Sequence, residues 1–259
     1  MKFTTRMFSL LAAAAVISLT ASSVNAQTVL YSTNFNAPTY SDAILRGQDN
    51  WVNTSGQGTN DITVSNTATN GIVSMLTSGD DERHPFAATT SGSVYLAADI
   101  LVSAAQATGD YFIHLGDGGA SNFYARTYIK SGTTAGTFQM ALGTSSGTPV
   151  TYGAELNLNT AYHILARYDF VSGAANDTGA LYINPVDPLG VGDVPYVAAT
   201  TIGTDASSIA GVYLRQGSAA QSATLTVDNI TVTAVPEPST ILLGTVGLIG
   251  LVGLARRRK

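Results

Sequence analysis

Acid–base chemistry in this 259-residue chain depends on very few side chains. Glycoside hydrolysis needs two carboxylates that project into one cleft. Between the two apolar ends the glutamates are Glu82 and Glu155, which are far apart in sequence and each in an expected loop. The densest ionisable run, residues 80–85, ends at a proline and lacks the alternation of a strand, so we interpret it as a solvated turn. The sequence therefore predicts no carboxylate pair for hydrolysis.

The sequence also lacks the motifs of nucleophilic catalysis and of zinc sites. The chain has no cysteine, which excludes thiolate nucleophiles and cysteine-based zinc sites. Its three histidines lack the spacing of a zinc site. The serine-rich stretch 143–147 has the composition of a flexible turn and not of a nucleophile elbow.

Sugar binding is a chemistry that the polar and aromatic residues can support, because sugars stack on aromatic faces and hydrogen-bond to planar polar side chains. Polar loops carry such groups at four candidate glycan-binding residues: Trp51, Asp117, Asn122 and Tyr124. Trp51 is the only tryptophan, and filling the core beneath the N-terminal segment is an equal alternative for it.

The part of the chain between the ends is acidic. Residues 27–235 contain six Lys and Arg and sixteen Asp and Glu, a formal charge of −10, against −5 for the whole chain. An acidic surface repels phosphate backbones, so we expect no nucleic acid partner, whereas calcium and neutral polymers stay open. For most of these carboxylates solubility is a sufficient role.

Short strands must position these side chains. Residues 94–102 and 162–170 place apolar side chains at every second position, which is the pattern of half-buried strands. Clusters of Gly, Asn, Asp, Ser and Thr, which favour turns, separate seven further expected strands, at residues 72–76, 111–115, 124–130, 137–142, 180–183, 212–215 and 225–232. This succession predicts an all-β fold, an antiparallel β-sandwich of the jelly-roll type.

The last expected strand changes its apolar face. Leu225 and Val227 have one parity in the sequence, whereas Ile230 and Val232 have the other. A β-bulge at residues 228–229 would turn both pairs toward the core.

Three stretches together resemble the concanavalin A-like lectin/glucanase superfamily, namely residues 30–35, 112–117 and 223–232 with their Val-Asp-Asn-Ile ending. The resemblance implies that the first and last strands pair. Asn34 and Asp228, with backbone carbonyls, would then form an oxygen cage for calcium, and no other cofactor is expected. The Glu-x-Asp-x-x-Glu strand of the laminarinase-like hydrolases in this superfamily is absent.

Polysaccharide lyases of the same fold imply a second chemistry, proton abstraction beside a uronate carboxylate. The residues that match are His114 and Tyr128, with Arg126 as the neutralising cation. Nothing in the sequence places His114 opposite the other two, and an acidic domain would repel a polyuronate. A polysaccharide-active enzyme, either lyase or glycoside hydrolase, is therefore the alternative to a non-catalytic role.

The first 26 residues are typical of a cleavable signal peptide. A positively charged start precedes an apolar stretch, which ends on small residues. Cleavage after Ala26 would leave Gln27 as the new N-terminus. We expect the signal peptide at residues 1–26 and one β-sandwich domain at residues 27–235, a length that suffices for a sizeable core.

The C-terminus combines an apolar run with a basic end. Residues 240–255 would rise about 24 Å as a helix, against a hydrocarbon core of about 30 Å. The four cations at residues 256–259 can extend this short span by snorkelling, and the positive-inside rule keeps them in the cytoplasm. The sequence therefore predicts a transmembrane helix with the main domain outside.

Pro236, Glu237 and Pro238 stand just before this run. Together with the signal peptide, this order of features in residues 236–259 resembles the PEP-CTERM sorting signal of Gram-negative bacteria. The resemblance implies an exosortase, a membrane peptidase that processes the protein near the motif, and an association with extracellular polysaccharide. The alternative is a single-pass anchor that keeps its tail.

These inferences together predict where the protein is exported and what it does there. The chain is exported, passes through an inner-membrane intermediate and reaches the cell surface or extracellular matrix. There we expect a non-catalytic binding or structural role in contact with extracellular polysaccharide.

Overall fold

The computed structural model describes residues 27–67, 70–143, 151–200 and 204–237. The expected signal peptide with Ala26, and the expected C-terminal helix with Pro238, lie outside these residues. Within them the chain forms sixteen strands, and no helix there is long and apolar enough to cross a bilayer.

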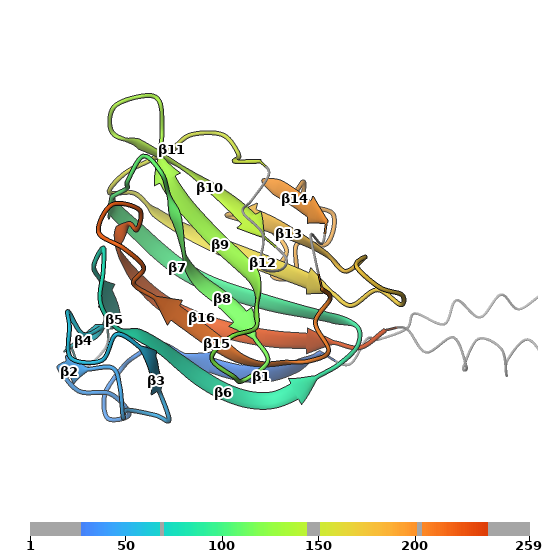
Figure 1. The fold of residues 1–259 in the computed structure, drawn as a ribbon, viewed down its shortest axis with the longest axis horizontal. Coiled ribbons are helices and arrows are strands. Elements are labelled where there is room, and N and C mark those ends of the chain that lie inside the picture. Colours follow the sequence, from blue (N-terminus) through green and yellow to red (C-terminus); the bar gives the residue numbers. More distant parts are fainter. Residues whose placement is uncertain (1–26, 68–69, 144–150, 201–203, 238–259) are drawn as a thin grey trace, which may run out of the picture.

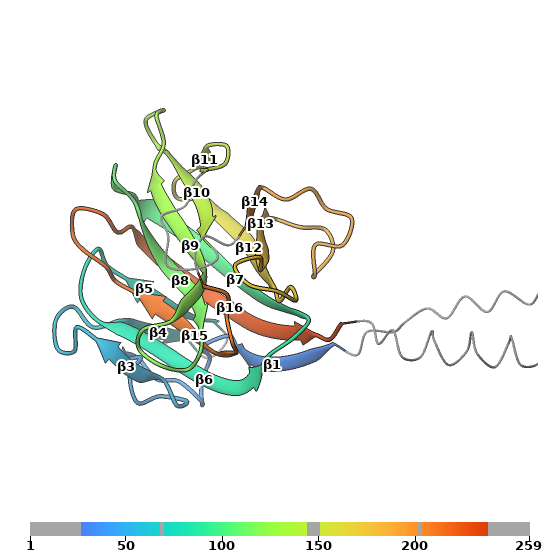
Figure 2. The same ribbon diagram turned by 45° about the vertical axis from the view of Figure 1, so that its right-hand side comes forward.

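The strands form two antiparallel sheets that pack face to face as a β-sandwich (Figures 1 and 2). The nine-stranded sheet has the spatial order β14 (Val197–Thr200), β13 (Thr178–Ile183), β12 (Ala161–Asp169), β7 (Ser93–Ala104), β16 (Thr224–Val235), β5 (Asn70–Met75), β4 (Thr63–Thr67) and β2 (Ala43–Ile44), and β1 (Thr28–Thr33) also pairs with β16. The seven-stranded sheet has the order β11 (Leu156–Asn157), β10 (Thr137–Gly143), β9 (Phe123–Ser131), β8 (Asp110–Gly116), β15 (Ile209–Arg215), β6 (Asp81–Thr89) and β3 (Val52–Ser55). The predicted fold class is confirmed.

The core lies between the sheets and follows the predicted alternation. In β7 the side chains at every second position from Val94 to Val102 are buried against the other sheet, and the same holds for Ile164, Ala166 and Tyr168 in β12. Side chains at the intervening positions point to the outer faces of the sandwich, because successive residues of a strand project to opposite sides. Each sheet thus presents one outer face on which function can be built.

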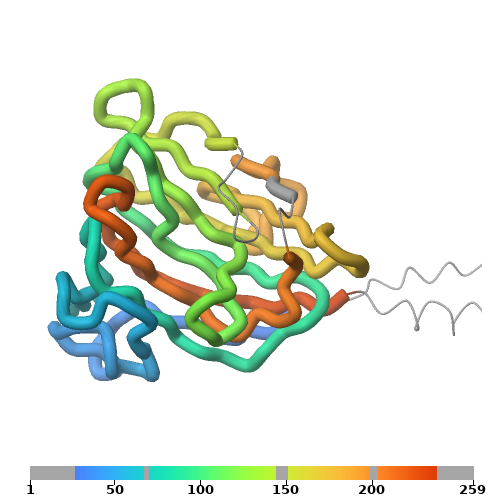
Figure 3. Tube along the Cα trace, in the orientation of Figure 1, coloured from blue at the N-terminus to red at the C-terminus, as the bar shows by residue number. Residues whose placement is uncertain are grey.

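The first and last strands lie side by side, as Figure 3 shows for the ends of the described chain. Thr28 is opposite Ala234 in the antiparallel pair of β1 and β16. The pairing of these strands is confirmed, and it brings the start of β1 next to the end of β16.

The predicted bulge in β16 is also confirmed. The register of β16 against β7 shifts between Asp228 and Thr231, and Asn229 has a φ of 49°. Leu225, Val227, Ile230 and Val232 are consequently all buried. Because an asparagine adopts positive φ more readily than most residues, Asn229 suits the bulge position.

The interpretation of residues 80–85 as a solvated turn is wrong. Asp81–Thr89 form strand β6 between β15 and β3, and Asp80 and Glu82 are fully buried. Arg46 Nη1 lies 2.5 Å from Asp80 Oδ2, which compensates one buried charge. Burial and the neighbouring Asp80 carboxyl raise the pKa of Glu82 to about 9, so Glu82 is neutral at pH 7. A protonated glutamate can occupy an inward position that a carboxylate could not.

Candidate functional site

Four of the six basic residues between positions 27 and 235 lie on the outer face of the seven-stranded sheet. They are Arg83 in β6, Arg126 and Lys130 in β9, and Arg215 in β15. Strand alternation puts Arg126 and Lys130 on the same side, while Ile129 between them packs in the core. The charge of the domain is therefore unevenly distributed over its surface.

Aromatic rings form a layer beneath these cations. The rings of His114 and Tyr213 stack with centroids 4.6 Å apart, and Phe123 lies 4.5 Å from His114. The Tyr111 ring lies 5.3 Å from His114 and 5.4 Å from Tyr128. All but the half-buried Phe123 are at most 9% exposed, so the layer is closely packed although it faces away from the sandwich core.

Cationic groups lie directly on these rings. Arg126 Cζ is 4.8 Å from the centre of the Tyr111 ring, and Arg215 Cζ is 4.1 Å from the same centre on β8. Lys130 Nζ lies 4.2 Å from the centre of the Tyr152 ring. Each such contact contributes about 0.5–1 kcal/mol when exposed to solvent and holds the charge in a fixed place. We call this surface the aromatic–basic face, made of Arg83, Tyr111, His114, Phe123, Arg126, Tyr128, Lys130, Tyr152, Tyr213 and Arg215.

Few hydrogen-bond acceptors balance the cations of the aromatic–basic face. Arg215 Nη1 lies 2.6 Å from Asp110 Oδ2 and is thus paired. Among the described residues, Arg126 Nη1 donates to the Tyr128 hydroxyl at 3.5 Å and Arg126 Nε has no acceptor. Arg83 Nε likewise has none among the described residues. Among the described residues, positive charge is therefore in excess on this face, although the domain as a whole is acidic.

His114 is neutral in this setting. Burial lowers its pKa to about 3, and the positive charges of Arg126 and Arg215 act in the same direction. Its Nδ1 lies 2.9 Å from the Leu115 carbonyl oxygen, so Nδ1 carries the proton and donates it. Burial also raises the pKa of Tyr213 to about 12. The aromatic layer thus has no charge of its own at neutral pH.

A pocket of about 310 Å³ lies beside Phe123, at the start of β9. Asn122 and Tyr124 line it together with Ser121, Thr204, Asp205 and Ser207. Asn122 Nδ2 donates to Asp117 Oδ2 at 2.7 Å, and Asp117 Oδ1 accepts from the Gly119 amide at 2.8 Å. Three of the four predicted glycan-binding residues, Asp117, Asn122 and Tyr124, therefore lie together next to the aromatic–basic face. Their role in glycan binding stays a prediction.

Trp51 lies elsewhere, in the core. Its side chain is fully buried, and its Nε1 lies 3.1 Å from the hydroxyl oxygens of both Tyr31 and Tyr40. The Tyr31 ring stacks on His84 at 3.7 Å in the same cluster. The indole has no exposed face for a sugar, so the structure supports the core alternative for Trp51.

The lyase candidates are brought together more closely than the sequence indicated. His114 and Tyr128 both contact the Tyr111 ring, and Arg126 lies above that ring. All three come from neighbouring strands β8 and β9 of one sheet. Sequence reasoning missed Arg83, Tyr111, Lys130, Tyr152, Tyr213 and Arg215, although the alternation Arg126-x-Tyr128-x-Lys130 and the pair Tyr213-x-Arg215 put these residue types on one face of a strand.

The expected calcium ligands are less well assembled. Asn34 lines a pocket of about 320 Å³ with Asn229, but Asp228 is not among the residues that line it. Across the described residues, no group of three or more His, Asp or Glu is placed to hold a metal ion. Calcium binding by Asn34 and Asp228 with backbone carbonyls stays a prediction.

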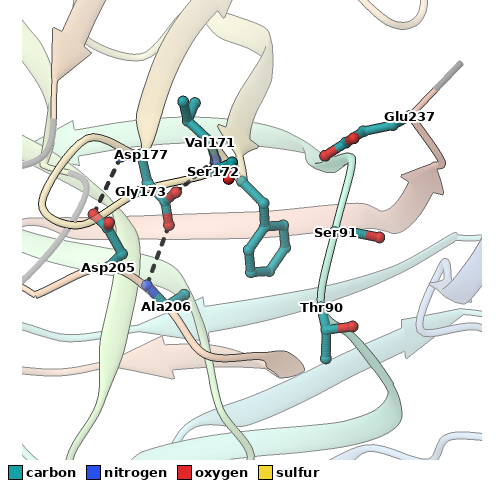
Figure 4. A pocket seen from close by; sticks show the side chains of 10 residues that line it. Thr90, Ser91, Val171, Ser172, Gly173, Asp177, Asp205, Ala206 and Glu237 are labelled. Carbon is teal, nitrogen blue, oxygen red and sulfur yellow. Dashed lines mark hydrogen bonds between the residues drawn. The ribbon is translucent and has the colours of Figure 1, made fainter. Parts of the chain in front are cut away.

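A further pocket, of about 300 Å³, lies where the described chain ends (Figure 4). Glu237 lines it across from Ser172 and Gly173, and Ser91 and Thr90 lie below Glu237 on the same side of the view (Figure 4). Asp177 accepts hydrogen bonds from the amides of Val171 at 2.7 Å and Ala206 at 3.2 Å, so both oxygens of this carboxylate already hold backbone amides in place.

Gly92 explains how the end of the chain packs there. Its φ is 75°, and a Cβ at this position would collide with the carbonyl oxygen of Val235. Pro236 Cα would also lie at 3.0 Å from such a Cβ. Residues 235–237 therefore lie against the β6–β7 turn, without a spacer between the last strand and the Pro-Glu pair.

One comparison with known proteins concerns the tail, and others concern solved structures. Residues 234–259 match the PEP-CTERM protein-sorting motif, so the predicted motif at Pro236, Glu237 and Pro238 is confirmed. The sequence matches no curated relative. Among solved structures, the chain is similar to the CBM2 module of the evolved Dit protein of Lactobacillus casei BL23 phage J-1, with 12% identity, 82% of this chain and 97% of that chain covered, and a TM-score of 0.46.

Two further structures have comparable similarity. Peanut lectin has 10% identity, with 81% of this chain and 97% of that chain covered and a TM-score of 0.45. Domain 4 of a GH43 extracellular arabinanase from Geobacillus stearothermophilus, in complex with arabinotriose, has 11% identity, with 82% and 84% covered and a TM-score of 0.42.

Proposed function

We propose that this protein is a cell-surface or matrix polysaccharide-binding protein whose β-sandwich acts without catalysis. Its PEP-CTERM motif indicates export and exosortase-dependent sorting to the cell surface. The observation that carries the binding role is the pocket of Asn122 and Tyr124 beside Phe123, at the edge of the aromatic–basic face. Amide groups next to aromatic rings supply both interactions that a sugar ring uses.

The binding test uses the purified full chain in mild detergent with an array of bacterial polysaccharides. We expect retention on at least one polymer, and Asn122→Ala should weaken that retention several-fold because it removes a pocket amide and frees Asp117. Asn157→Ala is the matched control, an exposed asparagine in β11 outside the pocket. Retention on no polysaccharide would refute the binding role.

The alternative is a polyuronate lyase, and the observation that favours it is the gathering of His114, Tyr128 and Arg126 around Tyr111. Against it, a histidine with a pKa of about 3 that is 2% exposed is a weak and poorly accessible base. The test is the ultraviolet absorbance of unsaturated uronate products. Product formation that disappears in both His114→Ala and Tyr128→Phe would replace the binding role with catalysis.

Processing of the tail belongs to the same proposal. An exosortase-type peptidase would release the chain from an inner-membrane intermediate by processing it near Pro236–Pro238. Mass spectrometry of the protein from the cell surface tests this, since processing removes the peptides from the apolar run while an uncleaved anchor keeps them. We expect these peptides to be missing from surface material and present in a strain without the peptidase.

A further inference from the structure

We propose that the aromatic–basic face binds an acidic polysaccharide, with uronate carboxylates pairing with Arg83, Arg126 and Lys130. This inference rests on the proposed function and adds the chemical class of the ligand. The overall charge left neutral polymers open as ligands, and the distribution of charge in the structure favours an acidic one.

The first argument is the excess of donors over acceptors. Among the described residues no carboxylate forms an ion pair with Arg83, Arg126 or Lys130, so their positive charge is not neutralised there. Arg83 Nε and Arg126 Nε are buried without an acceptor in the described part of the chain, and the contact from Arg126 Nη1 to Tyr128 is at the 3.5 Å limit of a hydrogen bond. Guanidinium groups form their strongest bonds with carboxylates, through two parallel N–H donors. A ligand that brings carboxylates supplies what the face lacks, whereas a neutral sugar supplies only hydroxyls.

The second argument is that the cations are held in place before any ligand arrives. Arg126 lies over two rings, with Cζ 4.8 Å from the centre of Tyr111 and 5.6 Å from that of Phe123. Lys130 is similarly placed over Tyr152. Because less side-chain entropy remains to be lost on binding, an ion pair formed here gains more affinity than one with a mobile surface arginine.

The third argument concerns the acidic remainder of the domain. At an ionic strength of about 0.15 M, charges more than about 8 Å away are largely screened. Asp110 is already paired with Arg215, so the charges next to an approaching ligand are mainly the unpaired cations. The local excess therefore governs the contact despite the formal charge of −10 over residues 27–235.

The spacing of the cations indicates a polymer and not a single sugar. Arg126 and Lys130 are four residues apart on β9, which corresponds to about 13 Å along the strand. One uronate cannot contact both. We therefore expect oligouronates of several residues to bind and the monosaccharide to bind poorly.

The experiment compares one polymer with its neutral derivative. The full chain in mild detergent is titrated with polygalacturonate and with the same polymer after reduction of its carboxyls to alcohols. We expect at least tenfold weaker binding to the reduced polymer. Equal binding to both would overturn this inference but leave the proposed function standing, whereas binding to no polysaccharide would refute both. Equally tight binding of DNA would show an unspecific anion site and would also overturn the inference.

Matched arginine variants locate the site. Arg83→Gln and Arg126→Gln should each weaken polygalacturonate binding at least fivefold, and Arg126→Lys should recover part of the loss because it keeps the charge without the planar fork. Arg167→Gln is the control, since Arg167 lies on the outer face of the other sheet and contacts its own tyrosine, Tyr182. Thermal melting of each variant separates loss of fold from loss of binding. Equal effects of Arg126→Gln and Arg167→Gln in folded protein would overturn the proposal.

Discussion

The outer faces of the two sheets both carry arginines and tyrosines, but the arginines differ in whether a carboxylate pairs with them. On the nine-stranded sheet, Arg167 Nε donates to Asp169 Oδ2 at 3.0 Å and Nη1 donates to the Tyr182 hydroxyl at 3.3 Å. The β13–β14 loop covers this face, with Leu189 packed against the cluster of Tyr95 and Tyr182. On the seven-stranded sheet, Arg126 and Arg215 lie over Tyr111. Among the described residues, the buried Nε atoms of Arg83 and Arg126 have no acceptor.

This difference separates a structural role from a binding role for one residue pair. An arginine beside a tyrosine has a structural role when a carboxylate such as Asp169 pairs with its charge. Asp169 also accepts from the hydroxyls of Ser93 at 2.6 Å and Thr178 at 3.2 Å, so its network is closed within the chain. Arg126 also lies over a tyrosine, but no carboxylate of the described residues forms an ion pair with it, so its charge is left for an external anion.

The largest expected effect tests what the two faces share, their packed tyrosine layers. Tyr213→Ala should lower the free energy of unfolding by about 3 kcal/mol, because it removes a 1% exposed ring that stacks on His114. Tyr182→Ala on the other face should cost a similar amount, since Tyr182 is 3% exposed. Urea denaturation measures both, with Tyr213→Phe as the control that keeps the ring. A loss below about 1 kcal/mol for Tyr213→Ala would mean that its ring is not part of a packed layer.

The next effect is a pH dependence of stability that His114 contributes on the aromatic–basic face. The pKa of His114 is lowered from about 6.5 in the unfolded chain to about 3 by burial. The unfolded state therefore takes up the proton first, so this contribution to stability is fully present above pH 6.5 and declines as pH falls toward 3. Between pH 6.5 and pH 5 the loss from His114 should reach about 2 kcal/mol.

The measurement is the difference between two stability profiles. His114→Phe keeps an aromatic ring in the layer and should flatten the decline below pH 6.5, while His163→Phe on the nine-stranded sheet should leave the contribution of His114 in place. Burial also lowers the pKa of His84, so part of the decline should remain in the His114 variant. Identical slopes for the wild type and His114→Phe would show that His114 is protonated as easily in the folded chain as in the unfolded one.

A smaller effect tests the difference between the faces directly. Arg167→Gln should lower the free energy of unfolding by about 1 kcal/mol, because it leaves Asp169 without its charged donor. Arg126→Gln should cost less, about 0.5 kcal/mol, because it loses contacts with the rings of Tyr111 and Phe123 but leaves no carboxylate of the described residues without its charged donor. Stability and binding would then respond in opposite order at the two arginines. If Arg126→Gln were the more destabilising of the two, the cations of the aromatic–basic face would be structural.

The sequence predicted two of the strands that alternate and one of the irregularities that break alternation. Period two identified β7 and β12, and the change of parity after Val227 predicted the bulge at residues 228–229. Strand β6 was not predicted because Asp81, Glu82 and Arg83 are residue types that are usually charged. No feature of the neighbouring sequence indicates that Glu82 is buried in its neutral form. A glutamate's low strand propensity applies to its charged, solvated form, whereas contacts with other parts of the chain decide whether Glu82 is charged.

The sequence predicted the loop residues at the pocket but did not predict the aromatic–basic face. Asp117, Asn122 and Tyr124 are close in sequence, so the pocket could be anticipated from one polar loop. The aromatic–basic face joins β6, β8, β9 and β15, whose order in the sheet differs from their order in the sequence. The pairing of Tyr213 with both Arg83 and His114 depends on that strand order, which no local pattern specifies.

The smallest expected effect concerns calcium on the nine-stranded sheet. Here the carboxylates are already engaged, since Asp99 Oδ1 lies 2.6 Å from His163 Nδ1 and Asp99 Oδ2 accepts from Asn229 at 2.7 Å. Burial raises the pKa of Asp228, which disfavours the anion that a calcium ligand must be. We therefore expect EDTA to shift the melting temperature by less than about 1 °C, as any ion bound to the folded state would raise it. A calcium-dependent rise of several degrees that is lost in Asp228→Asn would show that this face, too, is open to an ion and would remove the contrast between the sheets.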